Sequence, residues 1–412
     1  MFYLIYFIIL FVLFIRKLSA LHYLLGIIIV SLLGSFILDY NYMFKLPGTF
    51  FNYCFQLIIL SLFLLPWRRM QFSLTIETKN KVKIDKLTNF LLYTNAFSFV
   101  VLLSIFLLVI NTATDYTSFK NEEAPSFIRN LPIGSVVYLV LLYLATGSYF
   151  LLPLSFYYIM INNKKKSFFC FLFSLNLPLS GLVNLSRSSS SLFLLLCIFS
   201  YLMFRNSLTS NQKRQFNYVF LIVGIIMVLT FTNITLNRFQ DTNYYDRAMS
   251  NQNIIHETAT YSIVDYYSQW YKNSNDVIDL YKFKTFGGQL SFPLLGLVSE
   301  KLGIISDFNL QKKMTVYRMW PNNYYTFNGL VSNLLFDFGY IGTVLFALIY
   351  YFFVKKLSPI KRVINIEQLL VLTVLVILPM TSIFNSWMNV SSYNFVLIYA
   401  WIIYTYLKLK TK

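Results

Sequence analysis

The chain has 412 residues, of which 57% are hydrophobic and 12% charged, and its mean hydropathy is +0.60. A soluble domain carries about a quarter charged residues, so this composition excludes an ordinary soluble protein. The formal charge of +18 could indicate a nucleic-acid partner, but the positions of the cations, described below, leave no support for one.

Apolar stretches recur along the whole chain, with charged breaks between them. A bilayer core requires about 20 apolar residues per helical span. The sequence therefore predicts an all-α polytopic membrane protein of about eleven transmembrane helices. The predicted spans are 2–15, 20–38, 50–66, 87–110, 132–161, 167–185, 190–204, 217–236, 328–354, 363–384 and 392–407.

The first apolar run is predicted to be a span and not a cleaved signal peptide. Its cations, Arg16 and Lys17, follow the run instead of preceding it. We therefore expect the N-terminus outside the cell and, after eleven spans, the C-terminus in the cytoplasm.

The excess charge is confined to one set of the alternating loops, and this fixes the expected orientation. That set holds 21 cations and 3 acids, and the other set holds 13 of each. Loops rich in Lys and Arg stay on the cytoplasmic side, so the excess charge is a topology signal. The cytoplasmic cations are Arg16, Lys17, Arg68, Arg69, Lys79, Lys81, Lys83, Lys86, Lys164, Lys165, Lys166, Arg205, Lys213, Arg214, Lys355, Lys356, Lys361, Arg362, Lys408, Lys410 and Lys412, with the acids Glu77, Asp85 and Glu367.

The chain divides into transmembrane helices over 1–236, one large extracytoplasmic loop over 237–327, and further helices with a cytoplasmic tail over 328–412. The loop has ordinary polarity and contains two segments, 256–272 and 291–305, that read as short amphipathic helices. A loop of this length is more often functional than idle.

Arg187 lies in an external turn, Leu185-Ser186-Arg187, and is followed by a run of four serines. An arginine at membrane depth tends to face a cavity or a partner. Its planar guanidinium matches phosphate, and the start of the next helix also favours an anion. The alternative is an arginine that reaches to the membrane interface from a polar turn.

Arg238 follows a polar helix end in which Thr230, Asn233 and Asn237 share one face. Such a stripe is typical of a helix that lines a wet cavity, and it would place Arg238 and Arg247 at the cavity mouth. The alternative is an ordinary helix end at which the arginine pairs with a nearby aspartate.

The loop ends in a polar, aromatic run that leads into the ninth span, where an intramembrane carboxylate needs a partner or water. This carboxylate, Asp337, is either part of the cavity or half of a structural pair. The candidate residues of this region are Arg318, Asn322, Asn323, Asn328, Asn333 and Asp337.

His256 is the external histidine and is a candidate general base, since histidine titrates near neutral pH; the alternative is a surface residue of the loop. The sequence contains no P-loop, no GxGxxG and no HExxH motif, and its three cysteines fall inside predicted spans. We therefore expect no metal and no cofactor.

The chain resembles the Wzy-type oligosaccharide repeat-unit polymerases of O-antigen and capsule synthesis. The resemblance rests on Leu185-Ser186-Arg187-Ser188, on the large loop that opens with Asn237-Arg238, and on Tyr325-Thr326-Phe327-Asn328 with Phe336-Asp337-Phe338-Gly339-Tyr340-Ile341-Gly342. Ser188 stands where the family commonly has glycine. Helix number and loop position match over almost the full chain.

The resemblance implies a metal-independent membrane glycosyltransferase, similar in fold to the GT-C type. It would sit in the bacterial cytoplasmic membrane and join polyprenyl-pyrophosphate-linked oligosaccharide units at the external face, for O-antigen of lipopolysaccharide or for capsule. The polyprenyl-pyrophosphate-linked oligosaccharide and the lipid bilayer are the implied partners, and a chain-length regulator is compatible with the family.

The resemblance also suggests roles for the candidates: Arg187, Arg238 and Arg318 at the pyrophosphate, Arg247 in reserve, and His256 as base. Other functions remain open. An O-antigen ligase shares topology and chemistry but uses another acceptor. A lipid-linked glycan flippase or another transporter would usually show internal repeats, and a membrane scaffold would need no buried aspartate.

Overall fold

The structure is a computed structural model that describes residues 2–15, 17–38, 50–112, 135–183, 186, 188–239, 249, 254–281, 285–304, 327–359 and 362–409. At some helix positions, among them 234–239, the backbone alone is described. The described chain is all-α apart from one small ribbon, in which β1 (Thr75–Glu77) pairs in parallel with β2 (Val363–Asn365).

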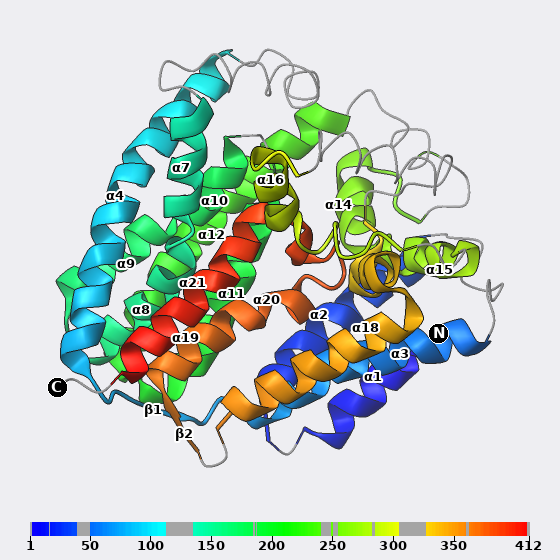
Figure 1. Ribbon diagram of the computed structural model, residues 1–412, viewed down its shortest axis with the longest axis horizontal. Coiled ribbons are helices and arrows are strands. Elements are labelled where there is room, and N and C mark those ends of the chain that lie inside the picture. The colour runs from blue at the N-terminus through cyan, green and yellow to red at the C-terminus, as the bar shows by residue number, and fades with distance from the viewer. Residues whose placement is uncertain are drawn as a thin grey trace.

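Helices follow one another along the chain and pack side by side (Figure 1). Their bounds are α1 (Phe2–Leu13), α2 (Ala20–Ile37), α3 (Phe50–Leu64) with η1 (Leu65–Arg69), α4 (Lys81–Thr112), α7 (Ser135–Ala145), α8 (Ser148–Met160), α9 (Lys164–Ser174), α10 (Asn176–Leu182), α11 (Ser188–Phe204) with η3 (Arg205–Ser207), α12 (Ser210–Phe239), α14 (Thr258–Ser268), α15 (Trp270–Leu280), α16 (Pro293–Lys301), α18 (Gly329–Leu357), α19 (Ile366–Leu375), α20 (Ile377–Met380), η4 (Trp387–Asn389) and α21 (Ser391–Lys408).

Among the described residues, 6 helical segments are long and apolar enough to cross a bilayer: 20–37, 50–69, 81–111, 137–160, 188–207 and 329–357. Shorter apolar helices cover 3–13 and 366–380. The protein is therefore a helical membrane protein. Each predicted span coincides with a helix or a helix pair, while the count of eleven and the direction of the chain through the membrane stay predictions.

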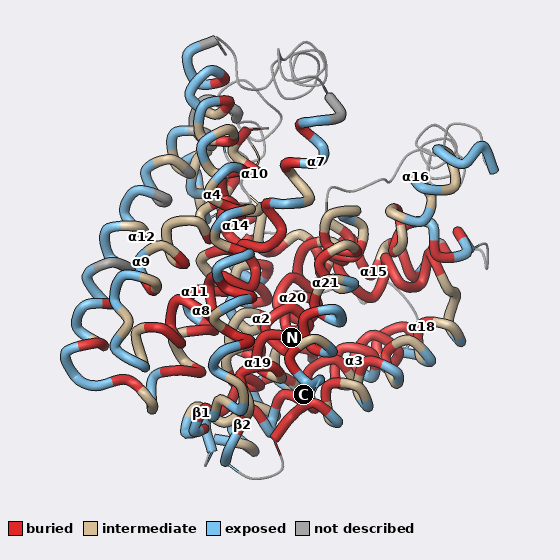
Figure 2. The backbone as a smooth tube through the Cα atoms, turned by 60° about the vertical axis from the view of Figure 1, so that its left-hand side comes forward, coloured by how far each residue is buried: buried red, intermediate tan, exposed pale blue. Residues whose placement is uncertain are grey.

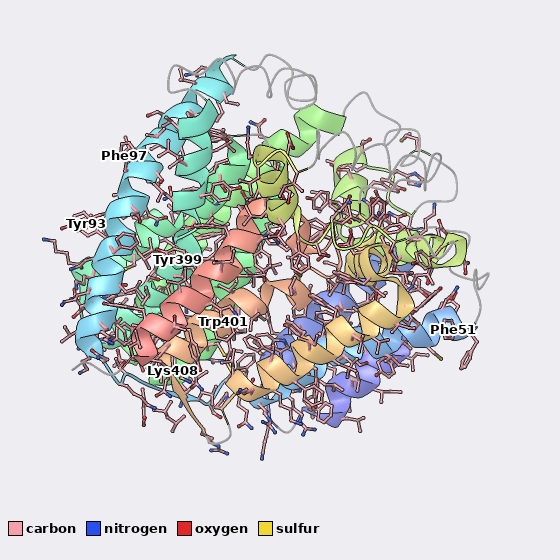
Figure 3. All side chains as sticks on the ribbon, in the orientation of Figure 1. Phe51, Tyr93, Phe97, Tyr399, Trp401 and Lys408 are labelled. Carbon is pink, nitrogen blue, oxygen red and sulfur yellow. The ribbon has the colours of Figure 1, made fainter. Side chains whose placement is uncertain are left out.

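The middle of the bundle is formed by α2, α8, α11, α19 and α20, which are largely buried (Figure 2). The outer faces of α4 and α12 are exposed. These outer faces are apolar. Tyr93 and Phe97 on α4 lie on the outside of the bundle and are 79% and 61% exposed (Figure 3). Exposed apolar side chains over so much surface are what a lipid-facing bundle requires.

Segments that carry the predicted cytoplasmic cations meet at one end of the bundle, which we call the basic end (residues 67–83, 160–166, 205–215, 355–359 and 362–365). Thr75 N donates to Arg362 O at 2.8 Å beside the β1–β2 pair, and Arg69 Nη1 donates to Lys355 O at 3.3 Å. Gln212 Nε2 donates to Ile159 O at 2.6 Å.

The opposite end, which we call the loop end, consists of residues 142–149, 181–183, 186, 188–191, 254–281, 285–304, 327–339 and 381–394. The predicted amphipathic segments are helical there. The segment predicted over 256–272 forms α14 and the start of α15, separated at Gln269, and α15 continues to Leu280. The segment predicted over 291–305 is the shorter helix α16.

Three predicted spans are not single helices. The span predicted over 132–161 breaks between Ala145 and Ser148, and the one over 167–185 breaks at Leu175. The span predicted over 363–384 ends its helical part at Met380, four residues early. Breaks in membrane helices are tolerated where the freed backbone groups are buried in protein or line a cavity.

Candidate functional site

A cavity of about 220 Å³ opens at the loop end where these breaks come together. We call it the serine cavity, because hydroxyl groups from four separate segments line it. Its lining residues are Leu142, Ala145, Thr146, Ser148, Tyr149, Leu177, Ser180, Gly181, Ser186, Ser189, Trp387, Val390 and Ser392.

The break between α7 and α8 supplies one wall of the cavity. Thr146 N and Gly147 N bond back to Tyr143 O and Leu144 O, which closes a tight turn before α8 begins. A Cβ at Gly147 would lie 2.3 Å from Asn95 Nδ2 on α4, so only glycine allows this packing. The turn leaves Thr146 and Ser148 facing the cavity.

The turn between α10 and α11 supplies the opposite wall. Ser186 N donates to Gly181 O at 2.9 Å, and a Cβ at Gly181 would lie 2.7 Å from both Cβ and Oγ of Ser189. The end of α10 and the start of α11 therefore approach as closely as the chain permits. Ser186 and Ser189, which both line the cavity, flank Arg187 in the sequence.

The cavity contains hydrogen-bonding capacity that the described protein does not use. Ser148 is 1% exposed, and its Oγ has no partner among the described residues. The hydroxyl groups of Thr146, Ser180, Ser186, Ser189 and Ser392 also line the cavity. The first backbone N–H groups of α11 add the positive end of a helix dipole. Together these groups are donors that an anionic or hydroxyl-rich ligand could satisfy.

Trp387 brings an aromatic surface to the same cavity. It belongs to the short helix η4, and its Nε1 donates to Tyr149 Oη at 3.3 Å across the bundle. An indole held by such a hydrogen bond presents a fixed apolar face beside polar groups, the combination that sugar recognition uses.

Four asparagines connect η4 to the start of α18. Asn389 Nδ2 donates to Asn333 Oδ1 at 2.8 Å, and Asn333 Nδ2 donates to Asn385 Oδ1 at 3.3 Å and to Gly329 O at 2.6 Å. Asn385 Oδ1 also accepts from Asn328 N at 2.9 Å. The predicted site residues Asn328 and Asn333 thus meet in one buried amide cluster, two residues along the chain from Trp387.

Asp337 holds the loop onto α18. Its Oδ1 accepts from Leu290 N at 2.9 Å and its Oδ2 from Ser291 N at 2.5 Å, and the residue is 1% exposed. A buried carboxylate that receives backbone N–H groups is well satisfied. Through these contacts Asp337 ties residues 290–291 to α18.

The helix bends directly after Asp337, at Gly339, which has φ 66° and ψ −175°. A Cβ there would lie 3.3 Å from Tyr281 Oη. The bend frees Phe336 O, which accepts from Phe286 N at 2.9 Å. At Gly342, the described atoms within 4 Å of an added Cβ belong to Phe338 of the same helix, at 2.6 Å and 3.7 Å.

The loop helices are anchored by polar contacts to the bundle. Tyr267 Oη lies 3.1 Å from Ser191 Oγ on α11, and Trp270 Nε1 donates to Ser31 Oγ at 2.6 Å. Asp279 Oδ1 accepts from Asn52 Nδ2 at 2.5 Å. Loss of surrounding water raises the pKa of Asp279, a rise that the Asn52 hydrogen bond opposes.

The remaining predicted residues do not all gather here. His256 is exposed before α14 and does not line the serine cavity. Arg238 lies in the last turn of α12, where only the backbone is described, and Thr230 Oγ1 bonds back to Ile226 O of its own helix. Five predicted residues lie outside the described ranges: Arg187, Arg247, Arg318, Asn322 and Asn323.

Sequence reasoning missed Thr146, Ser148, Tyr149 and Trp387. The first three lie within a span that looked continuous, and Trp387 lies in a short turn near the end of the chain. Two signals were present: the helix-breaking pair Thr146-Gly147, and the polar run Asn385-Ser386 before the tryptophan. In the described ranges, no group of three or more His, Cys, Asp or Glu residues could hold a metal ion.

No family model, no curated protein and no solved structure matches this chain. Its function is therefore argued from its own residues.

Proposed function

We propose that the protein is a membrane glycosyltransferase that polymerises polyprenyl-pyrophosphate-linked oligosaccharide units at the loop end. The observation that carries the proposal is the serine cavity, whose hydroxyls and helix start flank Arg187 in the sequence. It offers donors for a pyrophosphate next to an aromatic face for a sugar.

The size of the cavity suits this reaction. Sites for whole small molecules span about 300–1,000 Å³, and the serine cavity is smaller, at about 220 Å³. It would hold the phosphate or the first sugar of a lipid-linked unit. The polyprenyl chain would stay in lipid along the apolar outer surface, and the rest of the glycan would extend past α14 and α16.

In the proposed reaction, an acceptor hydroxyl oxygen forms a bond to the anomeric carbon of the donor. The bond from that carbon to the pyrophosphate oxygen breaks, and the pyrophosphate leaves with the electron pair. Donors arranged in advance around the leaving oxygens stabilise this charge. The acceptor proton passes to a base; His256 is the candidate from sequence, and its exposed position requires the loop to bring it closer.

The test is polymer formation by the purified protein in vesicles that contain polyprenyl-pyrophosphate-linked repeat units as the sole substrate. Arg187→Ala should abolish polymer and leave single lipid-linked units in place. Ser148→Ala should slow elongation by about tenfold to a hundredfold, since a hydrogen bond to a charged group contributes about 1.5–3 kcal/mol.

Ser104→Ala is the matched control, because Ser104 Oγ bonds to Val100 O on an exposed face of α4. Normal chain length in the Arg187 variant, or equal rates for the two serine variants, would contradict the proposal. In cells, single-repeat glycan after loss of the protein indicates a polymerase, whereas full polymer left on the carrier lipid indicates a ligase. Lipid-linked units trapped on the cytoplasmic side indicate a flippase.

A further inference from the structure

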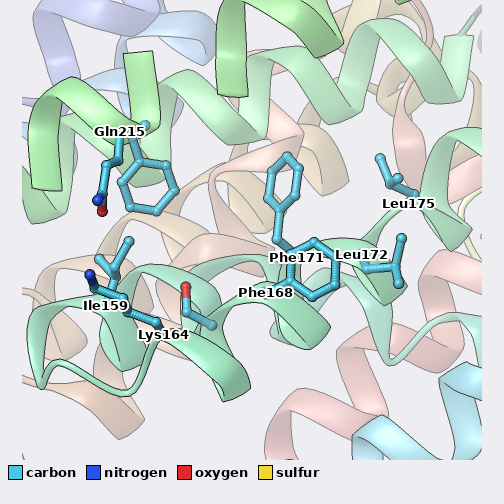
Figure 4. A pocket seen from close by; sticks show the side chains of 9 residues that line it. Ile159, Lys164, Phe168, Phe171, Leu172, Leu175 and Gln215 are labelled. Atoms are coloured by element: carbon cyan, nitrogen blue, oxygen red, sulfur yellow. The ribbon is translucent and has the colours of Figure 1, made fainter. Parts of the chain in front are cut away.

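A second hollow of about 330 Å³ extends from the basic end between α9 and the start of α12 (Figure 4), and it shares no lining residue with the serine cavity. We call it the α9–α12 groove. Ile159, Ser167, Phe168 and Phe216 line it, together with the polar residues Lys164 and Gln215 and the apolar residues Phe171, Leu172 and Leu175.

The groove changes from polar to apolar along its length. Figure 4 shows Lys164 and Gln215 at one end and Leu172 and Leu175 at the other. From Lys164 to Leu175 the helix rises by about 16 Å at about 1.5 Å per residue. That length matches one leaflet of a hydrocarbon core about 30 Å thick.

The polar mouth carries excess positive charge. Lys164 and Lys165 are exposed at the start of α9, and Lys213 and Arg214 immediately precede Gln215 on α12. Asp85 is the acid that contacts this group, and it already pairs with Lys166 at 2.8 Å. The mouth therefore retains cations without a described acidic partner, beside the N-terminal ends of two helices.

The walls of the groove are fixed by contacts of their own. Phe216 stacks on Phe156 of α8, with ring centroids 4.3 Å apart and an interplanar angle of 10°. Gln212 Nε2 bonds to Ile159 O and to Asn162 Oδ1, and Ser167 Oγ bonds to Ser155 O. These contacts fix Phe216 and Ser167, together with the backbone of Ile159, around the groove.

We propose that the α9–α12 groove binds an anionic phospholipid of the leaflet that faces the basic end, with its headgroup at Lys164 and one acyl chain along Phe168, Phe171 and Leu172. Basic pockets between membrane helices are suited to anionic headgroups, and the apolar depth fits a chain of that leaflet. The site is separate from the proposed polymerase reaction and does not depend on it.

The test is native mass spectrometry of the full-length protein, released from bilayer discs of phosphatidylglycerol mixed with phosphatidylcholine. The wild type should retain phosphatidylglycerol at least about fivefold over phosphatidylcholine, the factor expected for one cation at a membrane surface. Lys164→Glu should remove that preference. Leu172→Trp, which fills the groove, should remove the retained lipid itself.

Lys356→Glu, at the end of α18, is the charge control, and Leu107→Trp, at an exposed site on α4, is the size control; both should retain phosphatidylglycerol as the wild type does. Each variant is first checked for an unchanged thermal transition. If the wild type retains the two lipids equally, the preference for an anionic headgroup is contradicted. If Leu172→Trp retains as much lipid as the wild type, the assignment of the lipid to this groove is contradicted. A dimer lost in Leu172→Trp would show that a second copy of the chain fills the groove, which also overturns the proposal.

Discussion

At the basic end, the connecting segments are held by paired contacts. β1 pairs with β2, and Lys166 forms an ion pair with Asp85, which also accepts a hydrogen bond from Tyr158 Oη. At the loop end, polar groups are buried in larger number and many lack a partner. The buried side-chain atoms without one among the described residues are Ser148 Oγ, Ser190 Oγ, Ser291 Oγ, Asn328 Oδ1, Ser382 Oγ, Ser386 Oγ and Asn389 Oδ1, whereas the described residues of the basic end contribute none.

On the proposed function, this difference marks the loop end as the one that binds the substrate. A buried polar group without a partner costs about 1–3 kcal/mol, so a concentration of them at one end calls for an explanation. Of these groups, Ser148 lines the serine cavity, and on the proposed function a ligand supplies its missing partner. The expected effects of substitution should therefore differ in kind: changes that reshape the serine cavity should affect activity, whereas changes at the structural contacts of either end should affect stability.

The largest effect on stability is expected for Asp337→Ala. It leaves the buried N–H groups of Leu290 and Ser291 unpaired and should lower the free energy of unfolding by about 3 kcal/mol. Thermal unfolding in detergent measures this, and protease cleavage within 285–292 should become faster. Glu77→Ala, at the exposed β1, is the control and should change neither; an unaltered transition for the Asp337 variant would show that it does not hold the loop.

Gly339→Ala should destabilise by about 1–3 kcal/mol, because its φ of 66° and ψ of −175° are tolerated almost solely by glycine. The matched change Gly224→Ala on α12 meets nothing within 4 Å and should stabilise by up to about 1 kcal/mol. Chemical denaturation of the two variants gives the comparison. Effects of the same sign would mean that the bend in α18 is not required.

Gly181→Ala tests whether the shape of the serine cavity controls the reaction. The added methyl meets Ser189 at 2.7 Å and must separate α10 from α11. Misplacing a reacting group by about 1 Å can slow a reaction by about a hundredfold. We expect the smaller shift caused by this methyl to slow elongation by about tenfold. Gly26→Ala on α2 meets nothing within 4 Å and should leave the rate unchanged. Equal elongation rates for both variants would separate the cavity from catalysis.

Lys83→Met tests the basic end. Lys83 Nζ donates to the carbonyl oxygens of Tyr406 and Leu409 at the end of α21, where a cation is favoured by the helix dipole. Its loss should lower stability by about 1 kcal/mol without changing the length distribution of the polymer. A shortened polymer at unchanged stability would contradict the division between the two ends.

The smallest effect is a pH dependence at Asp279, whose pKa is raised by loss of water. A raised pKa means that this residue contributes stability below the ordinary value of about 3.9 and loses that contribution as pH rises through the raised value. Asp279→Asn keeps an oxygen for Asn52 and should unfold at a slightly higher temperature than the wild type at pH 7. This difference in unfolding temperature should vanish near about pH 3.5. A difference that persists at that pH would show that the ionisation of Asp279 is not its cause.

Much of this fold could be predicted from hydrophobic runs, because a lipid-facing helix must be apolar over its length. The positions of α2, α4 and α18 follow directly from such runs. The breaks at Thr146-Gly147 and after Met380 could not be placed, since glycine and proline occur inside continuous membrane helices too. The position of the first break is set by packing against Asn95, and that of the second by packing against the start of α18.

The site was predictable only in part for the same reason. The serines around Arg187 stood out as a run, and two of them, Ser186 and Ser189, line the cavity. Trp387 lies 198 residues after Ser189 and 239 after Ser148, and no local pattern joins them. Asp337 was recognised as a buried carboxylate, but the identity of its partners, two backbone amides of the loop, depends on tertiary structure.

The most direct test of the central claim is photo-crosslinking with a polyprenyl-pyrophosphate-linked oligosaccharide that carries a diazirine on its first sugar. The account predicts labelled peptides from 142–149, 180–189 and 387–392, with labelling reduced in the Gly181→Ala variant. Label confined to other segments, with none in these three, would contradict the claim that the serine cavity holds the reacting end of the substrate.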